Sequence, residues 1–264
     1  MRRFFLTMKS FLWKLTLKYL VNPNKLVNIH GNKMFLDSRD SLLLSIRKNY
    51  EPRHVALMKR IVKQGETVVD IGAHIGYYTL ILAETVGPKG KVFAFEPNPE
   101  NFEVLKKNVE INGYKNVILE QKAVSNKNGK AKFYFSKINS GDGKIYATKE
   151  ERGSCEVNSI KLDDYFKKKR IKPSFFKMDI QGAEPKAFEG MKWILDNPSL
   201  KFTTEFQPEA IESAGYSPKE FLDRIREEGL SIYDLGKKEV IKDNDSLVEY
   251  YKSINYFTTL YCYK

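Results

Sequence analysis

Short apolar runs and amphipathic segments alternate along most of this 264-residue chain. The apolar runs stop at Gly, Pro, Asn or acidic residues, as buried strands commonly do. They predict strands at 67–71, 91–95, 117–121, 175–180, 201–206, 230–235 and 257–263. Between these runs, apolar residues at three- and four-residue spacing predict helices at 77–86, 99–112, a segment that ends at 193, and 218–228.

Strands that alternate with helices of these lengths form βαβ units, and such units build a parallel sheet covered by helices. The pattern therefore predicts an α/β fold with seven sheet strands. We expect the last two strands, at 230–235 and 257–263, to form an antiparallel edge.

Two regions depart from this rhythm. Upstream, residues 33–37 predict a short strand that leads into a helix near 41–47, and residues 53–63 predict a helix that Gly65 stops. We place residues 1–49 in a basic N-terminal helix with a lead-in segment and residues 50–264 in the main domain.

The second departure, at 131–162, predicts an insertion near the mouth of a substrate site. Strands are expected at 131–135 and 156–162, and the stretch 139–153 between them holds three glycines and mixed charges, as surface loops do.

The positive charge of the chain is concentrated at its N-terminus. The net charge is +12, and residues 1–50 hold ten Lys or Arg against Asp37 and Asp40, which is an excess of +8 and leaves +4 for the remainder. This asymmetry favours contact with an anionic surface such as phospholipid. One helical face there is apolar, through Phe4, Phe5, Met8, Phe11, Leu12, Leu15 and Tyr19. The pattern is equally typical of a helix on a membrane surface and of one that packs on its own domain or on a sister subunit.

Localisation follows from what these segments lack. No stretch approaches the roughly 20 apolar residues of a membrane span, and lysines interrupt any signal-peptide core. Cys155 and Cys262 are far apart and show no metal-ligand spacing, which fits a reducing compartment. We expect a cytoplasmic protein, peripheral to the inner face of the membrane if the N-terminal helix binds lipid.

The most informative stretch is Asp70-Ile71-Gly72-Ala73-His74, which follows one predicted strand and precedes a predicted helix. Glycine at 72 lets the backbone approach a ligand, and helix N-terminal amides attract an anionic group. A carboxylate at 70 suits the ammonium group of a methionine moiety. The spacing Asp-x-Gly-x-x-x-Gly, completed by Gly76, differs from the Gly-x-Gly-x-x-Gly of dinucleotide sites. The loop therefore favours S-adenosylmethionine over NAD.

A second carboxylate follows the next strand. Glu96 and Pro97 end the run 91–95, and ligands of open α/β sheets bind at the carboxyl ends of strands. A carboxylate there can accept hydrogen bonds from both ribose hydroxyls.

A third set of acidic residues follows the strand at 175–180. Asp179 and Glu184 are the candidates for taking a proton from an acceptor hydroxyl, and Gly182 permits the turn that brings Glu184 back. The alternative for Glu184 is a carboxylate that stabilises a helix N-terminus. Asp179, Glu184 and Glu205 together could instead hold a divalent cation through oxygen ligands, although no metal ligand is assigned.

Taken together, these motifs resemble the FkbM family of class I S-adenosylmethionine-dependent methyltransferases. The resemblance runs from about Lys33 to the C-terminus. It rests on five motifs in order, Tyr50-Glu51-Pro52, Val69-Asp70-Ile71-Gly72-Ala73-His74-Ile75-Gly76-Tyr77-Tyr78-Thr79, Phe95-Glu96-Pro97, Ile160-Lys161-Leu162-Asp163-Asp164 and Lys177-Met178-Asp179-Ile180-Gln181-Gly182-Ala183-Glu184. It implies a Rossmann-like, seven-stranded sheet with the last strand inserted antiparallel, and O-methylation of sugars or other hydroxylated natural products.

The resemblance also implies roles for particular residues. It places Asp70, Gly72 and Gly76 at the methionine end of the cofactor, Glu96 at the ribose, and Ala123 and Val124 beside the adenine. The further residues expected at the cofactor are Tyr50, Glu51, Ala73, His74, Tyr77, Pro97 and Asp179. Where the family often has Glu-Phe-His-Pro, this chain has Glu205-Phe206-Gln207-Pro208, so an amide replaces the imidazole and residue 207 loses the support for a general-base or metal-ligand role.

Three other functions were weighed against O-methylation of a small-molecule, glycan or glycolipid acceptor. An RNA base methyltransferase would need an Asn- or Asp-Pro-Pro-aromatic motif that this chain lacks after residue 178, so we do not expect a nucleic-acid partner, although ribose methylation stays open. A dehydrogenase is disfavoured by the glycine spacing. A non-catalytic scaffold is disfavoured by the acidic residues at 70, 96 and 179.

Overall fold

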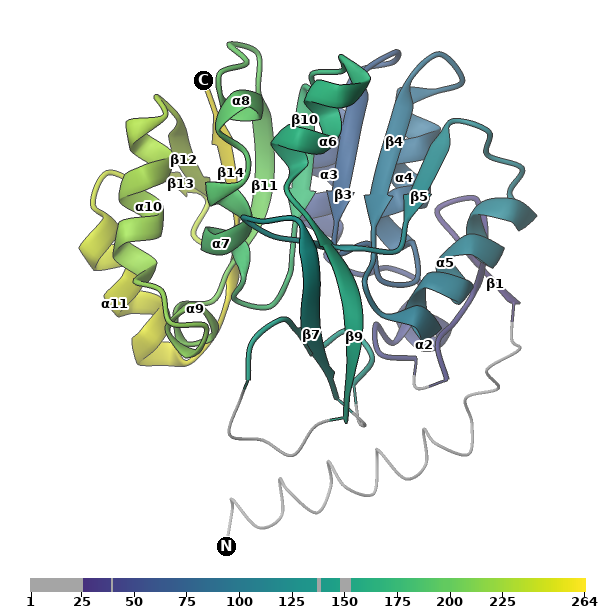
Figure 1. Ribbon diagram of the computed structural model, residues 1–264, viewed down its shortest axis with the longest axis horizontal. Coiled ribbons are helices and arrows are strands. Elements are labelled where there is room, and N and C mark those ends of the chain that lie inside the picture. Colours follow the sequence, from purple (N-terminus) through teal and green to yellow (C-terminus); the bar gives the residue numbers. More distant parts are fainter. Residues whose placement is uncertain (1–25, 39, 137–138, 148–152) are drawn as a thin grey trace, which may run out of the picture.

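An eight-stranded sheet forms the centre of the molecule (Figure 1). The computed structural model describes residues 26–38, 40–136, 139–147 and 153–264. The strand order is β13-β12-β14-β11-β10-β3-β4-β5, and the five strands from β11 to β5 run parallel. These five are β3 (Thr67–Ile71), β4 (Lys91–Phe95), β5 (Val117–Glu120), β10 (Phe175–Met178) and β11 (Lys201–Phe206). The expected parallel α/β sheet is confirmed.

The other end of the sheet is antiparallel, but its arrangement differs from the edge predicted by the chain rhythm. Strand β14 (Thr258–Tyr263) lies between β11 and β12 (Ser231–Asp234) and is antiparallel to both. This is the inserted last strand that the family resemblance implies. An eighth, two-residue strand, β13 (Glu239–Val240), forms the edge, and both of its residues are exposed.

Alternation along the parallel strands sends side chains into two cores. Val68, Val92 and Phe175 face one core, whereas their neighbours Val69 and Phe176 face the other. The first core is covered by α3 (Pro52–Ile61), α4 (Tyr77–Val86) and α5 (Pro99–Ile111). The second is covered by α6 (Leu162–Lys169), α7 (Glu184–Glu189), α8 (Lys192–Leu195), α9 (Pro208–Ser213), α10 (Pro218–Glu227) and α11 (Asn244–Ile254).

Several observed elements differ from the predicted ones. The strand expected at 156–162 ends at Ile160, and Leu162 already begins α6. The helix expected to reach Trp193 is broken into α7 and α8 around Gly190. Helices α9 and α11 had no predicted counterpart, although Asp243 caps α11 by accepting a hydrogen bond from the amide of Asp245.

The lead-in segment packs on the same domain. Strands β1 (Leu26–Ile29) and β2 (Asn32–Phe35) pair antiparallel, and a short helix, α2 (Leu44–Arg47), follows. Asn108 on α5 ties β2 down, because its Oδ1 accepts from the amide of Phe35 at 2.6 Å and its Nδ2 donates to the Phe35 carbonyl at 2.9 Å. The boundary at residue 50 stays a prediction.

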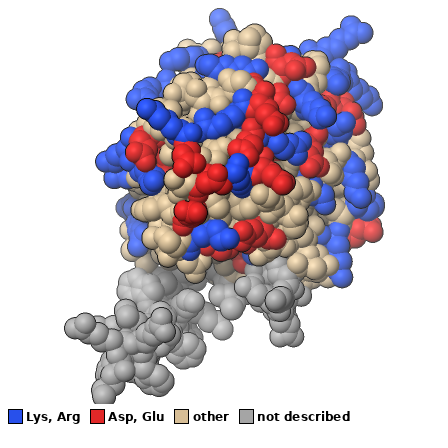
Figure 2. Space-filling view, turned by 90° about the vertical axis from the view of Figure 1, so that its left-hand side faces the viewer, with Lys and Arg blue, Asp and Glu red and all other residues tan. Residues whose placement is uncertain are grey.

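The predicted N-terminal amphipathic helix and its membrane contact lie outside the described residues. Among the described helices, none combines the length and apolar character that crossing a bilayer requires. The face formed by α10 and α11 carries Lys, Arg, Asp and Glu interspersed rather than one sign of charge (Figure 2). Lys219 pairs with Asp223 within α10, and Lys252 of α11 pairs with Glu212 of α9.

The insertion forms a separate small sheet below the carboxyl ends of the parallel strands (Figure 1). Its order is β6-β9-β7-β8. The strands are β6 (Ala123–Val124), β7 (Gly129–Phe135), β8 (Gly143–Lys144) and β9 (Gly153–Ile160). Because β7 and β9 extend past the edge of the main sheet, they wall the region where a ligand of an α/β fold is expected.

Candidate active site

A cavity of about 340 Å³ lies at the carboxyl ends of β3, β4, β10 and β11, and the insertion closes one side of it. Ten of the sequence-predicted cofactor residues line it, namely Tyr50, Gly72, Ala73, His74, Tyr77, Glu96, Pro97, Ala123, Val124 and Asp179. Glu205 also lines it. Glu51, Asp70, Gly76 and Glu184 do not belong to its lining and lie behind it.

The loop after β3 has the conformation that its glycines allow. Gly72 has φ +79°, and a Cβ there would overlap the carbonyl oxygen of Asp179, so the turn needs glycine. The amides of Gly72 and Ala73 both donate to the Phe95 carbonyl at 3.0 Å, which joins this loop to the end of β4. Gly76, with φ +95°, begins α4 as its N-cap.

Asp70 lies one layer behind the cavity wall. Its carboxylate is fully buried, and Oδ2 accepts a hydrogen bond from the Thr79 hydroxyl at 2.6 Å. Oδ1 accepts no hydrogen bond among the described residues and faces the Lys177 ammonium at 3.4 Å. The expected role of Asp70 at the methionine end therefore stays a prediction. In this geometry Asp70 pairs with Lys177, and Lys177 lines the cavity.

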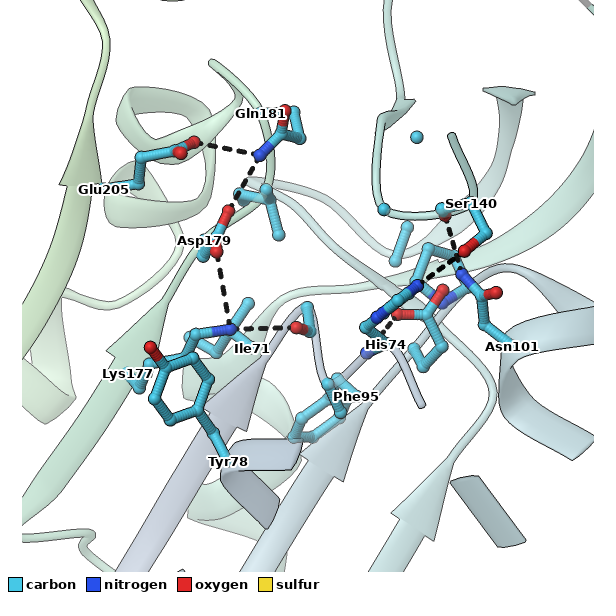
Figure 3. Close-up of a pocket in the computed structure, with 18 of the residues that line it drawn as sticks. Ile71, His74, Tyr78, Phe95, Asn101, Ser140, Lys177, Asp179, Gln181 and Glu205 are labelled. Carbon is cyan, nitrogen blue, oxygen red and sulfur yellow. Dashed lines mark hydrogen bonds and ion pairs between the residues drawn. The ribbon is translucent and has the colours of Figure 1, made fainter. Parts of the chain in front are cut away.

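Lys177 is a site residue to which sequence reasoning assigned no role. It is 3% exposed, lines the cavity and donates to the Gly72 carbonyl at 2.9 Å. Its Nζ also lies 3.9 Å from Asp179 Oδ2 (Figure 3). Burial alone would lower the pKa of Lys177, but the carboxylates of Asp70, Asp179 and Glu51 raise it above its usual value, so the ammonium stays charged. A lysine inside the apolar run of β10 was the available signal.

Glu96 lies on the opposite side of the cavity and is 5% exposed. Oε2 accepts from the His74 amide at 2.8 Å and Oε1 from the Asn98 amide at 2.9 Å. Burial raises the pKa of Glu96 to about 7, and these two hydrogen bonds oppose the rise. Each carboxylate oxygen keeps acceptor capacity for a ligand hydroxyl.

The insertion completes this side of the cavity with residues that the sequence did not single out. Phe133 and Ile145 join Ala123 and Val124 in an apolar part of the lining. Ser140 links α5 to the loop after β3. Its hydroxyl lies 2.8 Å from Nε2 of His74 in that loop, and its carbonyl accepts a hydrogen bond at 2.9 Å from Nδ2 of Asn101 on α5 (Figure 3). Burial lowers the pKa of His74, which favours the neutral imidazole.

Tyr50 is held over the cavity by Tyr77. The Tyr77 hydroxyl accepts from the Tyr50 amide at 3.0 Å and donates to the Tyr50 carbonyl at 2.8 Å. Behind Tyr50, Glu51 accepts a hydrogen bond from the Tyr78 hydroxyl and pairs with His54 at 3.1 Å.

The three acidic residues predicted after β10 and β11 do come together. Oxygens of Asp179, Glu184 and Glu205 lie within 4.8 Å of one another. Gln181 Nε2 donates to both Asp179 Oδ1 and Glu205 Oε2 at 3.0 Å (Figure 3). Burial raises the pKa of Glu205 well above its usual range, and the nearby carboxylates of Asp179, Glu184 and Glu51 raise it further.

Glu184 differs from the other two acids in its surroundings. It is 1% exposed, and its Oε1 accepts a hydrogen bond from the Ile180 amide at 2.8 Å. Burial raises its pKa to about 7. Glu184 therefore stabilises the turn at Gly182, whose φ is +97°, and Asp179 and Glu205 are the carboxyl groups that an acceptor can reach.

Comparison with known proteins places this geometry in a family context. A family model described as methyltransferase FkbM domain matches residues 70–232. The chain is 27% identical over 179 residues to the hexuronic acid methyltransferase AglP of Haloferax volcanii, which covers 67% of this chain and 68% of that protein. It is 39% identical over 70 residues to protein-L-isoaspartate O-methyltransferase 1 of Archaeoglobus fulgidus, or 26% of this chain and 32% of that protein.

The chain thus spans about a third of the length of that isoaspartate methyltransferase. Among solved structures, the FkbM methyltransferase of Methylobacillus flagellatus is similar with a TM-score of 0.47 and 17% identity, covering 75% of this chain and 43% of that one.

Proposed function

Because this chain belongs to the FkbM methyltransferase family, we propose that it transfers a methyl group from S-adenosylmethionine to a hydroxyl group of a sugar, glycan, glycolipid or related natural product. One observation carries the proposal: Glu96 at the end of β4 and Asp179 at the end of β10 line a single cavity.

The residues of the cavity fit S-adenosylmethionine. Glu96 offers a buried carboxylate in the cavity lining, and a carboxylate can accept hydrogen bonds from two ribose hydroxyls. Ala123, Val124 and Phe133 offer an apolar wall suited to an adenine ring. The volume of about 340 Å³ lies within the roughly 300–1,000 Å³ typical of small-molecule sites.

When bound, S-adenosylmethionine supplies an electrophilic methyl group, which leaves its sulfur as the acceptor oxygen forms a bond to the methyl carbon. The contribution of the protein is to position the acceptor, exclude water and accept the hydroxyl proton. Asp179 is the proton acceptor. The Lys177 ammonium lies 3.9 Å from its Oδ2, and the Gln181 amide donates a hydrogen bond to its Oδ1 and fixes its orientation.

A divalent cation held by Asp179, Glu184 and Glu205 is the second candidate role for these acids. Two contacts favour the proton-acceptor role instead. The Gln181 amide hydrogens point at Asp179 and Glu205, where a cation would need oxygen ligands. The Ile180 amide occupies Glu184 Oε1. If turnover disappears with EDTA and returns with Mg²⁺, the cation role replaces the one proposed here.

The sugar acceptor is supported by the relative named as a hexuronic acid methyltransferase, which is similar over two thirds of both chains. The deciding experiment has two parts. Isothermal titration should detect binding of S-adenosylhomocysteine but not of NAD. Incubation with methyl-labelled S-adenosylmethionine and fractionated cell extract should then label a glycan or glycolipid fraction. If the label appears in RNA, ribose methylation replaces the proposed reaction. If the protein binds neither cofactor, the non-catalytic scaffold becomes the favoured function.

A further inference from the structure

Two aromatic rings stand at the acceptor side of the cavity, just before β14. Phe257 lines the cavity, and Tyr256 is 58% exposed, more than any other large hydrophobic side chain in the described part of the chain. The two rings stack with centroids 4.8 Å apart and planes 22° apart. The exposed ring of Tyr256 therefore continues, toward solvent, the aromatic surface that Phe257 begins in the lining of the cavity.

The same rim carries an uncommitted amide. Gln207 lines the cavity next to Glu205 and precedes α9, but its side chain caps no amide of that helix. Its side chain makes no hydrogen bond within the described ranges of the chain. Tyr50 lines the cavity as well.

We propose that Tyr256, Phe257 and Gln207 form the acceptor subsite, and that it takes the pyranose ring of an uncharged sugar. This inference rests on the proposed function. A pyranose has a face of C–H groups that packs against an aromatic ring, and an edge of hydroxyls that pairs with an amide. With its ring against Tyr256 and Phe257, the sugar directs one hydroxyl toward Asp179 and the others toward Gln207.

The charge of this end of the cavity selects an uncharged sugar. Oxygens of Asp179, Glu184 and Glu205 lie within 4.8 Å of one another, whereas the nearby ammonium of Lys177 is already paired with Asp70 and Asp179. A sugar carboxylate placed here would meet like charges in a partly buried site. The subsite therefore differs from what the name of the hexuronic acid methyltransferase implies for that relative.

The test uses the full chain saturated with S-adenosylhomocysteine. It is applied to immobilised oligosaccharides of neutral hexoses and N-acetylhexosamines, together with matched oligosaccharides that contain hexuronic acid. We expect binding to neutral members, with dissociation constants for the strongest of them then measured in solution. Loss of one aromatic stacking contact in Tyr256→Ala should weaken that binding by about tenfold.

Two variants serve as controls and a third tests the amide. Tyr256→Phe keeps the ring and should bind within about twofold of the unchanged protein. Tyr250→Ala removes a 42% exposed ring from α11 that does not line the cavity, and it should leave sugar binding unchanged. Gln207→Ala should also weaken binding, and all variants should keep their affinity for S-adenosylhomocysteine.

The outcomes separate the two proposals. Failure to bind S-adenosylhomocysteine overturns the proposed function. Normal S-adenosylhomocysteine affinity with equal sugar binding by Tyr256→Ala and the unchanged protein overturns the subsite alone. So does binding to hexuronic acid members only, or to no sugar at all.

Discussion

The two sides of the cavity are built from different kinds of interaction. At Glu96, each carboxylate oxygen accepts a hydrogen bond from a backbone amide, so the acid is fixed by the loops that follow β3 and β4. At Asp179, the partners are the side chains of Lys177 and Gln181, and a second carboxyl group, Glu205, accepts a hydrogen bond from the same Gln181 amide (Figure 3). Glu96 is thus held by backbone donors, whereas Asp179 is held by side chains. We therefore expect that substitutions can separate cofactor binding from proton transfer.

The largest effect is expected from Asp179→Asn, which tests whether proton transfer depends on the Asp179 side of the cavity. Asparagine keeps the size of the side chain but cannot accept a proton, so we expect turnover to fall by about 10²- to 10⁴-fold. Affinity for S-adenosylhomocysteine should change by less than about threefold, since no charge-assisted contact on the Glu96 side is lost. Single-turnover methylation and isothermal titration measure the two effects. Unchanged turnover would remove Asp179 from the mechanism.

Glu96→Gln should do the reverse. The amide oxygen can replace one acceptor, but the charge-assisted hydrogen bonds to ribose are lost, and affinity for S-adenosylhomocysteine should fall by about 10- to 100-fold. Turnover at saturating cofactor should stay close to that of the unchanged protein. A variant that binds normally but turns over slowly would contradict the assignment of the two sides.

The pH dependence of cofactor binding tests the role of Glu96 without a substitution. With a pKa of about 7 in the free protein, Glu96 is mostly protonated at pH 6 and mostly ionised at pH 8. Ribose hydroxyls donate best to the ionised form, so affinity should rise with pH by up to about tenfold between these values. Titrations at the two pH values measure it, and Glu96→Gln should flatten the difference. A fall in affinity with rising pH would refute this account.

The smallest effect is expected from Glu184→Gln. The amide oxygen can still accept from the Ile180 amide, and the change removes a negative charge near Asp179 and Glu205. We expect turnover within about fivefold of the unchanged protein, far from the loss in a residue that moves the proton. Thermal unfolding should also shift by only a few degrees. A loss of turnover as large as that of Asp179→Asn would return Glu184 to the role of proton acceptor.

The sheet was predictable because its information is local. In β3, β4 and β11, the apolar run, its ends and the following turn all lie within a few residues of sequence, and the predicted bounds match those of the structure. Helix α11 was missed although Asp243 and Leu247 carry a capping and packing signal, because five charged residues within 242–252 and the exposed Tyr250 obscure its apolar spacing. The interior position of β14 depends on pairing with β11, which lies about 50 residues earlier, and no local pattern encodes it.

The site was predicted only where strand ends carry it. Glu96 and Asp179 follow apolar runs, so their place in the cavity could be read from sequence. Asn101 and Ser140 could not be, since they meet through the insertion across 39 positions of sequence. Asp70 shows the converse limit: its motif is visible, but whether its carboxylate faces the ligand or lies behind Lys177 depends on the register of β3 against β10.

The contacts of Ser140 with His74 and Asn101 also bear on the order in which ligands enter and leave the cavity. They tie the loop that follows β7 across the side where adenosine is proposed to lie, whereas the rim at Tyr256 stays open to solvent. If the cofactor and the sugar bind as proposed, the sugar can leave through the open rim while these bonds stay intact, whereas the cofactor can leave on the adenosine side only after they break. We therefore predict an ordered cycle, in which the cofactor binds first and leaves last.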